Sequence, residues 1–251
     1  MSDEKSLKYN EPWILQRADP YVYRHTDGSY YFTASVPAYD GIVLRRAGSL
    51  AELSGAEEVM IWKKYESGPM SYHIWAPEIH YLFGKWYIYF AGGEKEDIWK
   101  IRPYVLECSG DDPLTDEWVE LGKMKRAAED EFSFEAFSLD ATVFENKGEY
   151  YYVWAEKVGV GKMISNLYIA KMESGNQLKT VQVLLTTPDY DWERKGFWVN
   201  EGPAVIHHDG KMFLTYSASE TGVDYCVGML SIDEDADILD PRLWKKERYP
   251  V

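Results

Sequence analysis

Four carboxylates recur along the chain at nearly constant spacing, each near the start of a strand-like segment. They are Asp19, Glu78, Asp140 and Glu201, and the intervals between them are 59, 62 and 61 residues. Carboxylates gathered in one place have two chemical uses, because they either bind a hard cation or transfer protons. Cleavage of a glycosidic bond, for example, requires a carboxylic acid that protonates the leaving oxygen and a carboxylate on the opposite side of the sugar.

A single acid at the start of a strand has an ordinary structural interpretation, because it can cap a turn or pair with a neighbouring arginine. Recurrence in four repeats, each among proline, glycine or aromatic residues, favours a shared site instead. Like charges crowded into a partly dry site differ in pKa, so that one carboxyl stays protonated while another is ionised. The four acids are therefore candidates for acid–base chemistry.

The elements that must position these acids are indicated by a second repeat. Aromatic segments that open with glycine begin at Gly28, Gly84, Gly148 and Gly210, at intervals of 56, 64 and 62 residues. Each follows a turn signal and a strand-like run, and further strand-like runs complete a unit of about 60 residues. No segment of useful length has helical periodicity. Tandem four-stranded units predict an all-β chain folded as a β-propeller.

We predict about four blades, over residues 18–63, 73–123, 138–185 and 199–248, within a single domain that spans residues 1–251. The first strand of each propeller blade lines the central channel, so equivalent positions in successive blades surround one axis. We therefore expect the four acids to converge on one funnel.

The segments around three of the acids resemble the acidic motifs of glycoside hydrolase family 43. These segments are Arg-Ala-Asp-Pro-Tyr-Val at Asp19, Ser-Leu-Asp-Ala-Thr-Val-Phe at Asp140 and Val-Asn-Glu-Gly-Pro-Ala-Val at Glu201. Residues 74–79, Ile-Trp-Ala-Pro-Glu-Ile, resemble a strand-entry motif of the same family. The likeness runs from about Asn10 to the last residue. It implies an inverting mechanism in which Asp19 is the general base, Glu201 is the general acid, and Asp140 orients the acid and modulates its pKa.

The resemblance also implies a five-bladed propeller, whose last blade carries a Gly-His-Asn segment near a central metal ion or water. The chain contains no such segment, so we expect its fifth blade to be missing. The resemblance requires no cofactor, although it allows a calcium ion in the central channel. It implies no metal at the catalytic residues.

The surrounding sequence is most similar to the α-L-arabinofuranosidase branch of the family, through residues 101–106 and 198–202. The resemblance thus implies a hydrolase that removes terminal α-L-arabinofuranosyl units from arabinan or arabinoxylan oligosaccharides, as part of hemicellulose degradation. A β-xylosidase, an arabinanase and a carbohydrate-binding propeller without catalysis remain alternatives. The choice between endo and exo action stays open.

Candidate substrate-binding residues lie close to the acidic motifs. Trp75 and Trp198 are expected near the rim, where they could stack on a sugar or pack in the core. Arg102 could donate hydrogen bonds to sugar hydroxyls or to the acids, and Glu78 and Asn200 are further candidates. The five histidines show no zinc-binding spacing.

Composition limits the partners. The formal net charge of −15 disfavours binding to nucleic acid or to an anionic membrane. Two cysteines supply no disulfide framework, and the first residues have no apolar core of a secretion signal. The expected location is therefore the cytoplasm, or outside the cell if a signal has been removed.

Overall fold

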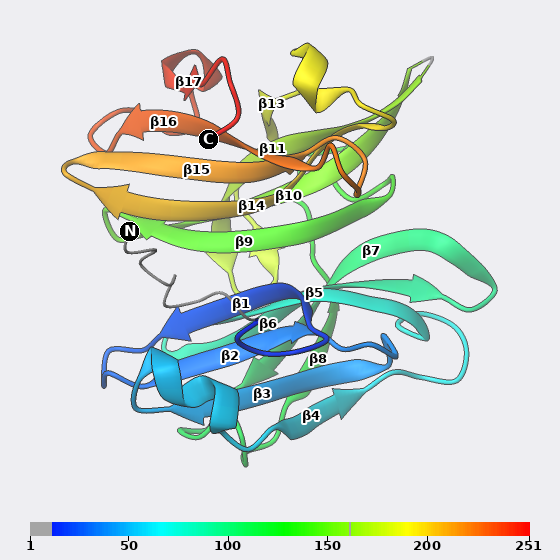
Figure 1. Ribbon diagram of the computed structural model, residues 1–251, viewed down its shortest axis with the longest axis vertical. Coiled ribbons are helices and arrows are strands. Elements are labelled where there is room, and N and C mark those ends of the chain that lie inside the picture. The colour runs from blue at the N-terminus through cyan, green and yellow to red at the C-terminus, as the bar shows by residue number, and fades with distance from the viewer. Residues whose placement is uncertain (1–11, 161) are drawn as a thin grey trace, which may run out of the picture.

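The computed structural model describes residues 12–160 and 162–251, and nearly all of its regular structure is antiparallel β-sheet (Figure 1). The first sheet contains β1 (Ala18–Arg24), β2 (Tyr30–Ser35), β3 (Gly41–Ala47) and β4 (Val59–Lys63), paired in chain order. The second contains β5 (Tyr72–Leu82), β6 (Lys85–Glu94), β7 (Asp97–Cys108) and β8 (Val119–Lys123), also in chain order.

The third sheet contains β9 (Ser138–Asn146), β10 (Glu149–Val160) and β11 (Lys162–Ser174), and the short strands β12 (Gln177–Leu178) and β13 (Val183–Thr186) both pair with β11. The fourth contains β14 (Trp198–His208), β15 (Lys211–Ala218), β16 (Cys226–Asp233) and β17 (Lys245–Lys246). A short parallel contact between β11 and β14 joins these two sheets. The 3-10 helices are η1 (Leu50–Gly55), η2 (Asp191–Glu193) and η3 (Pro241–Leu243).

Each of these sheets has the strand order expected of a propeller blade, so the predicted β-propeller is confirmed. The glycine-led segments form the second strands β2, β6, β10 and β15, as predicted from their spacing. Figure 1 shows the first two sheets in the lower half of the view and the last two in the upper half.

The apolar core lies between consecutive sheets. Ile42 of β3 packs in one cluster with Ile88 of β6, which joins sheets one and two. Tyr89 of β6 and Trp154 of β10 share the cluster between sheets two and three, and a third cluster joins sheets three and four. Burial of large aromatic side chains at these contacts supplies most of the hydrophobic stabilisation that holds the blades together.

The first strand of every sheet carries a β-bulge at the same place. The ladder shifts register between Ala18 and Tyr21, between Trp75 and Glu78, between Leu139 and Thr142, and between Glu201 and Ala204. The first bulged residue has a positive φ in each case: 50° at Asp19, 45° at Ala76, 49° at Asp140 and 57° at Gly202. A bulge bends its strand and turns a side chain away from the regular alternation, so it aims residues toward the channel.

The bulges correct one expectation from the sequence. Only Asp19 and Asp140 occupy equivalent positions, because the corresponding residues of the other two sheets are Ala76 and Gly202. Glu201 comes one residue before Gly202, the first bulged residue of its strand. Glu78 comes two residues after Ala76, the first bulged residue of its own strand. The four acids are thus not in one register, and they need not share one role.

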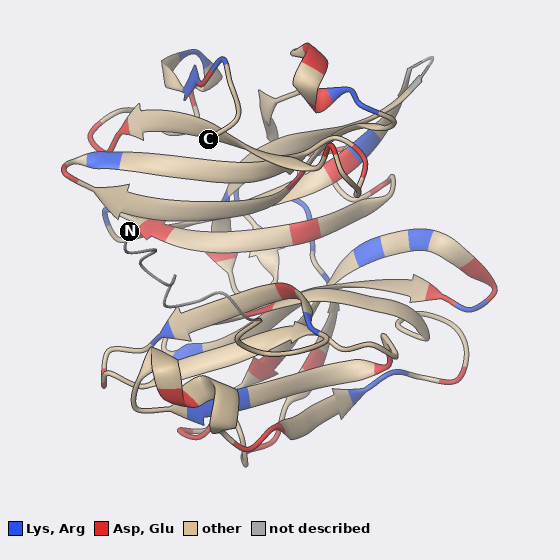
Figure 2. Cartoon of the chain, viewed as in Figure 1, with Lys and Arg blue, Asp and Glu red and all other residues tan. Residues whose placement is uncertain are grey.

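Acidic residues are spread over both halves of the molecule and occur on turns as well as strands (Figure 2). Among the described residues, no helix is long and apolar enough to cross a bilayer.

Candidate active site

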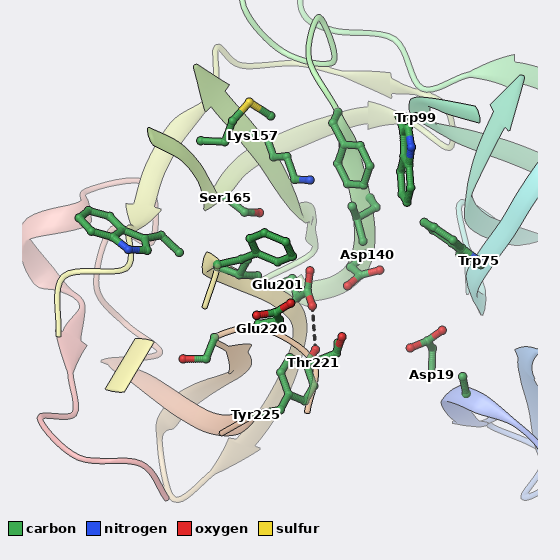
Figure 3. A pocket seen from close by; sticks show the side chains of 18 of the residues that line it. Asp19, Trp75, Trp99, Asp140, Lys157, Ser165, Glu201, Glu220, Thr221 and Tyr225 are labelled. Carbon is green, nitrogen blue, oxygen red and sulfur yellow. Dashed lines mark hydrogen bonds between the residues drawn. The ribbon is translucent and has the colours of Figure 1, made fainter. Parts of the chain in front are cut away.

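A pocket of about 650 Å³ opens where the bulges of three sheets meet. Asp19 of β1, Asp140 of β9 and Glu201 of β14 all line it, and Figure 3 shows their carboxylates turned toward the same space. The structure therefore brings together the three acids expected to be catalytic. They are separated by more than 60 residues along the chain at each step, and only the packing of the sheets makes them neighbours.

Asp19 is exposed to the pocket and is held by a serine of the neighbouring strand. The Ser35 hydroxyl of β2 donates a hydrogen bond to Asp19 Oδ2 at 2.7 Å, and the same Ser35 Oγ accepts one from the Ala76 amide at 2.8 Å. The Ser35 hydroxyl thus links Asp19 of β1 to the backbone of β5. The neighbouring Arg17 pairs with Glu58 at 2.5 Å.

Asp140 is bonded to the backbone beside Glu201. The amide of Gly202 donates to Asp140 Oδ2 at 3.1 Å. Burial raises the pKa of Asp140 well above its ordinary value of 3.8, and the negative charges of Glu201 and Asp19 act in the same direction. The Gly202 amide opposes this shift only in part. A bond to the strand that carries Glu201 suits Asp140 to orienting that acid.

Glu201 lies in the pocket with one donor and one cation near it. Burial raises the pKa of Glu201 above its ordinary value of 4.5, and the charge of Asp19 adds to the rise. The Tyr225 hydroxyl, which donates to Glu201 Oε1 at 2.9 Å, and the ammonium of Lys157 both act to lower it. A carboxyl with a raised pKa keeps its proton closer to neutral pH, which is the requirement for a general acid.

Lys157 and Tyr225 were missed by the sequence analysis. Lys157 is the single Lys or Arg among the described residues that line the pocket, and its Nζ lies 3.8 Å from the centre of the Phe137 ring. Burial lowers the pKa of this lysine, and Glu201 offsets part of the decrease. Lys157 directly follows the part of β10 that pairs with β9. The alternation of side chains between the two faces of β10 could have indicated that Lys157 points toward the pocket. Tyr225 lies in the loop between β15 and β16, and no repeated sequence pattern marks it as a site residue.

Aromatic side chains form much of the rest of the pocket wall. Trp75 and Trp198 both line it, as expected for residues that stack on a sugar. Trp99 and Phe197 line it as well, and they are 61% and 63% exposed. Large apolar side chains that remain exposed at a pocket mouth favour contact with a ligand. The described wall thus combines carboxylates with flat apolar faces.

Three residues expected to bind substrate lie outside the pocket wall. Arg102 donates to the carbonyl oxygens of Ile101 at 2.8 Å and of Glu135 at 2.5 Å. Asn200 is 0% exposed and donates to Glu193 at 2.9 Å. The structure therefore does not place either side chain where a sugar would touch it, because their polar groups are engaged within the protein.

Glu78, the third of these residues, lies near the acids but deeper. Its Oε2 is 2.9 Å from Nε2 of His80, and burial raises the pKa of Glu78. Its negative charge makes a small contribution to the rise in the pKa of Asp140. Glu78 thus affects the site through electrostatics, without lining the pocket.

The described residues do not gather a ligand set for a metal ion. No three side chains of His, Cys, Asp or Glu in this part of the chain converge as a metal site would require. Glu78 and His80 form a pair that is satisfied internally. The calcium ion that the family resemblance allowed stays a prediction, and the chemistry proposed below involves none.

Comparisons with known proteins agree with this geometry. The sequence model of Glycosyl hydrolases family 43 matches residues 9–251. An extracellular exo-α-(1→5)-L-arabinofuranosidase of Streptomyces chartreusis is 46% identical over 243 residues, which cover 97% of this chain and 72% of the relative. A protein of the same name from Streptomyces avermitilis is 47% identical over 246 residues, which cover 98% of this chain and 50% of the relative. The chain thus spans about half the length of the second relative.

A solved structure gives the same result for the fold. The crystal structure of an α-L-arabinofuranosidase from Lactobacillus brevis has a TM-score of 0.87 and 51% sequence identity. The match covers 96% of this chain and 75% of the other.

Proposed function

The chain belongs to family 43 of the glycosyl hydrolases, and we propose on this premise that it is an inverting exo-acting α-L-arabinofuranosidase. The observation that carries the proposal is that Asp19, Asp140 and Glu201 line one pocket in environments that differ in charge and burial. The Streptomyces and Lactobacillus relatives are named for arabinofuranosidase activity, which supports the choice of sugar.

In the proposed reaction, a terminal arabinofuranosyl unit enters the pocket with its glycosidic oxygen near Glu201. The protonated Glu201 carboxyl gives its proton to this oxygen while the bond to the anomeric carbon breaks. Asp19 takes a proton from a water molecule, whose oxygen attacks the anomeric carbon from the opposite side. The new hydroxyl therefore has the inverted configuration. Both carboxyl groups return to their starting states by exchanging protons with solvent.

The remaining pocket residues have supporting roles in this proposal. Asp140 holds the backbone beside Glu201 through the Gly202 amide. Trp75 and Trp198 provide flat faces for the sugar and for the unit that follows it. The substrates would be arabinan or arabinoxylan oligosaccharides.

Three alternatives remain, and an assay on nitrophenyl glycosides tests the choice of sugar. A β-xylosidase or an arabinanase of the same family would use the same acids on a different sugar or at an internal bond. A carbohydrate-binding propeller without catalysis would have no use for a buried proton donor such as Glu201. Nitrophenyl α-L-arabinofuranoside should be cleaved, whereas nitrophenyl β-D-xylopyranoside should be cleaved at least about tenfold more slowly. Equal or reversed rates would contradict the choice of sugar.

Stereochemistry tests the mechanism directly. An inverting acid and base stand about 6.5–9.5 Å apart to admit water, whereas a retaining pair is separated by about 5–5.5 Å. We predict the longer separation for Asp19 and Glu201. Proton NMR during the first minutes of hydrolysis should show β-arabinofuranose as the first product. First appearance of the α-anomer would indicate a retaining, covalent route.

We also propose that the protein acts outside the cell. Both Streptomyces relatives are named as extracellular enzymes, and oligosaccharides of plant polymers are released there. This replaces the expectation of a cytoplasmic location, which the comparisons do not support. Fractionation of the source cells, with arabinofuranosidase activity measured in medium and lysate, would test it.

A further inference from the structure

A buried carboxylate that the proposed reaction does not use lies behind the pocket wall. Glu193, at the end of η2, is 0% exposed. Its Oε2 accepts hydrogen bonds from the amides of Asp189 and Tyr190, both at 2.9 Å. Its Oε1 accepts from Tyr216 Oη of β15 at 2.9 Å. A buried carboxylate is tolerated only when its oxygens are paired in this way.

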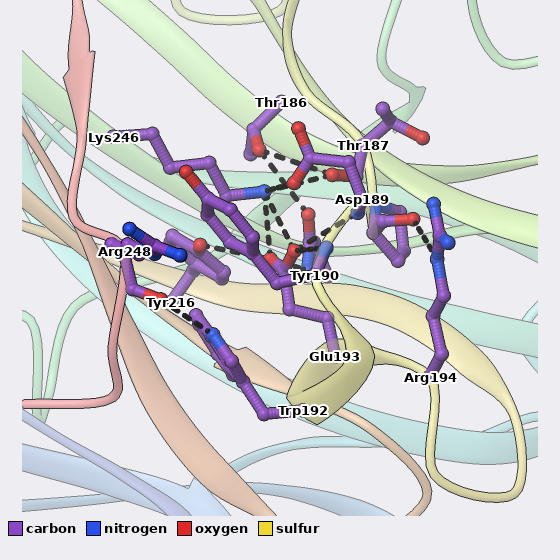
Figure 4. Close-up of polar contacts among 12 residues, drawn as sticks. Thr186, Thr187, Asp189, Tyr190, Trp192, Glu193, Arg194, Tyr216, Lys246 and Arg248 are labelled. Carbon is purple, nitrogen blue, oxygen red and sulfur yellow. Dashed lines mark hydrogen bonds and ion pairs between the residues drawn. The ribbon is translucent and has the colours of Figure 1, made fainter.

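A lysine completes the surroundings of Glu193, as Figure 4 shows. Lys246 Nζ of β17 lies 2.8 Å from both Glu193 oxygens, and it also contacts Asp189 Oδ1 at 2.6 Å. The Lys246 side chain is only 14% exposed, so solvent screens this ion pair weakly. Glu193 thus ties the loop before η2 to strands β15 and β17.

The same carboxylate reaches the strand of the proposed acid. Asn200 Nδ2 donates to Glu193 Oε1 at 2.9 Å, and Asn200 directly precedes Glu201 in β14. Asn200 is held at two more atoms, because its Oδ1 accepts from Thr186 Oγ1 and its carbonyl oxygen accepts from Ser165 Oγ, both at 3.3 Å. On the other side of Glu201, Gly202 is bonded to Asp140. Glu201 therefore lies between two anchored residues.

We propose that Glu193 is a positioning residue for the general acid, and that it acts by fixing Asn200 and so the backbone of Glu201. The inference rests on the proposed function, because it requires Glu201 to be the proton donor. An error of about 1 Å in the position of a catalytic group costs on the order of 100-fold in rate. Rigid anchoring of the strand at a bulge, where the regular ladder is interrupted, keeps Glu201 within reach of the leaving oxygen.

The test compares two leaving groups, because a purely structural role would affect both alike. The alkoxide leaving group of arabinobiose needs a proton from Glu201, whereas nitrophenolate needs little. In Glu193→Gln, the amide nitrogen replaces an acceptor with a donor, so at least one bond of the cluster is lost. We expect kcat/KM to fall about 10- to 100-fold on arabinobiose, with a fall of less than about 3-fold on nitrophenyl arabinofuranoside. Glu201→Gln provides the reference pattern.

Asp130→Asn is the matched control. Asp130 is 1% exposed and also accepts bonds from backbone amides, at Phe132 and Ser133, but it does not line the pocket. This variant should lower Tm without changing the ratio of the two activities. If Glu193→Gln does not fold, Asn200→Ala removes the link between Glu193 and the acid strand, together with the side-chain bond from Thr186, and should show the same selective loss.

The outcomes distinguish the proposed function from the proposed positioning role of Glu193. A wild-type protein that is inactive on both substrates, or a Glu201→Gln variant that loses both equally, would overturn the proposed function. A normal Glu201→Gln pattern, combined with an unchanged activity ratio in Glu193→Gln and Asn200→Ala, would overturn the positioning role alone.

Discussion

The amide of Gly202 in the fourth sheet donates a hydrogen bond to Asp140 Oδ2 in the third, at 3.1 Å. This bond connects the bulges of two blades, whose residues are 62 positions apart in the chain. It holds the residue after Glu201 against Asp140, whose pKa is raised by burial and by the charges of Glu201 and Asp19. The environment of the Glu201 carboxyl therefore depends on how the third and fourth sheets pack against each other.

The first prediction separates the roles of acid and base. Glu201→Ala should reduce kcat/KM on arabino-oligosaccharides by about 10²–10⁴-fold but spare nitrophenyl substrates, since a good leaving group needs little protonation. Asp19→Ala should lose both activities alike, because attack by water is required in each. Initial rates on the two substrate types measure the difference. Equal losses in both variants would show that the roles are assigned wrongly, even within the right site.

The second prediction concerns pH. The general acid works only when protonated, so activity decreases as pH rises through the pKa of Glu201. The Tyr225 hydroxyl and Lys157 both lower that pKa. Tyr225→Phe and Lys157→Met should therefore raise it and move the basic limb of the kcat/KM profile to higher pH. Tyr39→Phe, which alters another tyrosine of the pocket wall, is the control and should leave the limb unchanged. A limb that moves to lower pH in either test variant would contradict the assignment.

The third prediction concerns stability. The pKa of Asp140 is raised in the folded state, mainly by burial, so the native protein binds a proton that the unfolded chain has already released above pH 3.8. Stability is thus lost as pH rises from that value toward the raised pKa. Asp140→Asn keeps an oxygen for the Gly202 amide but removes the charge. It should increase Tm at pH 7 by about 2–4 °C, while activity is lost.

A second carboxyl, that of Asp130, should show the opposite change in Tm when it is replaced by an amide. Burial alone would raise the pKa of Asp130, but bonds from Ser133 and from the amides of Phe132 and Gln182 outweigh it and the pKa is lowered. Asp130→Asn should therefore decrease Tm at pH 7, and its effect should shrink as pH falls below 3.8 through the lowered pKa of Asp130. Thermal unfolding of both variants across this pH range, followed by circular dichroism, measures the two signs. Destabilisation by Asp140→Asn at pH 7 would argue against the raised pKa.

The fourth prediction tests the aromatic wall. Trp99 is 61% exposed and lines the pocket beside Trp75, with the two ring centres 6.5 Å apart. Trp99→Ala should raise KM for arabino-oligosaccharides about 3- to 10-fold, since an aromatic contact contributes about 0.5–1.5 kcal/mol. Nitrophenyl arabinofuranoside, which lacks further sugars, should respond less. Phe132→Ala removes an aromatic that is 68% exposed away from the pocket and should change neither constant.

The repeat was readable from the sequence because it depends on local patterns. Glycine-led turns and aromatic strands occur in each unit, and their spacing of 56, 64 and 62 residues nearly equals the spacing of the bulges, 57, 64 and 62. The spacing of the acids, 59, 62 and 61, does not. The hairpins thus predicted the frame of the propeller correctly, whereas equating the four acids with one another was wrong by one or two residues.

The individual site residues were predictable to different degrees. Asp19, Asp140, Glu201, Trp75 and Trp198 all line the pocket, since each is close to a recognisable strand start. Asn200 is beside Glu201 in the chain, but alternation along β14 turns it to the interior, where Glu193 accepts its hydrogen bond. Tyr225 contacts Glu201 from the loop between β15 and β16, 24 residues further along the chain, and only the folded structure brings the two together.

The sequence by itself thus determined the strands, their turns and the identity of the acids, because turn signals and strand patterns are local features of the chain. The side on which each acid points is decided by pairing with the adjacent strand, where a bulge of one residue redirects the side chain. The raised pKa values of Asp140 and Glu201 are decided one step later, since their burial and the neighbouring charges exist only once the four sheets that line the pocket have come together. The proton transfer proposed for Glu201 would accordingly be a property of the assembled propeller, built from residues that the chain keeps far apart.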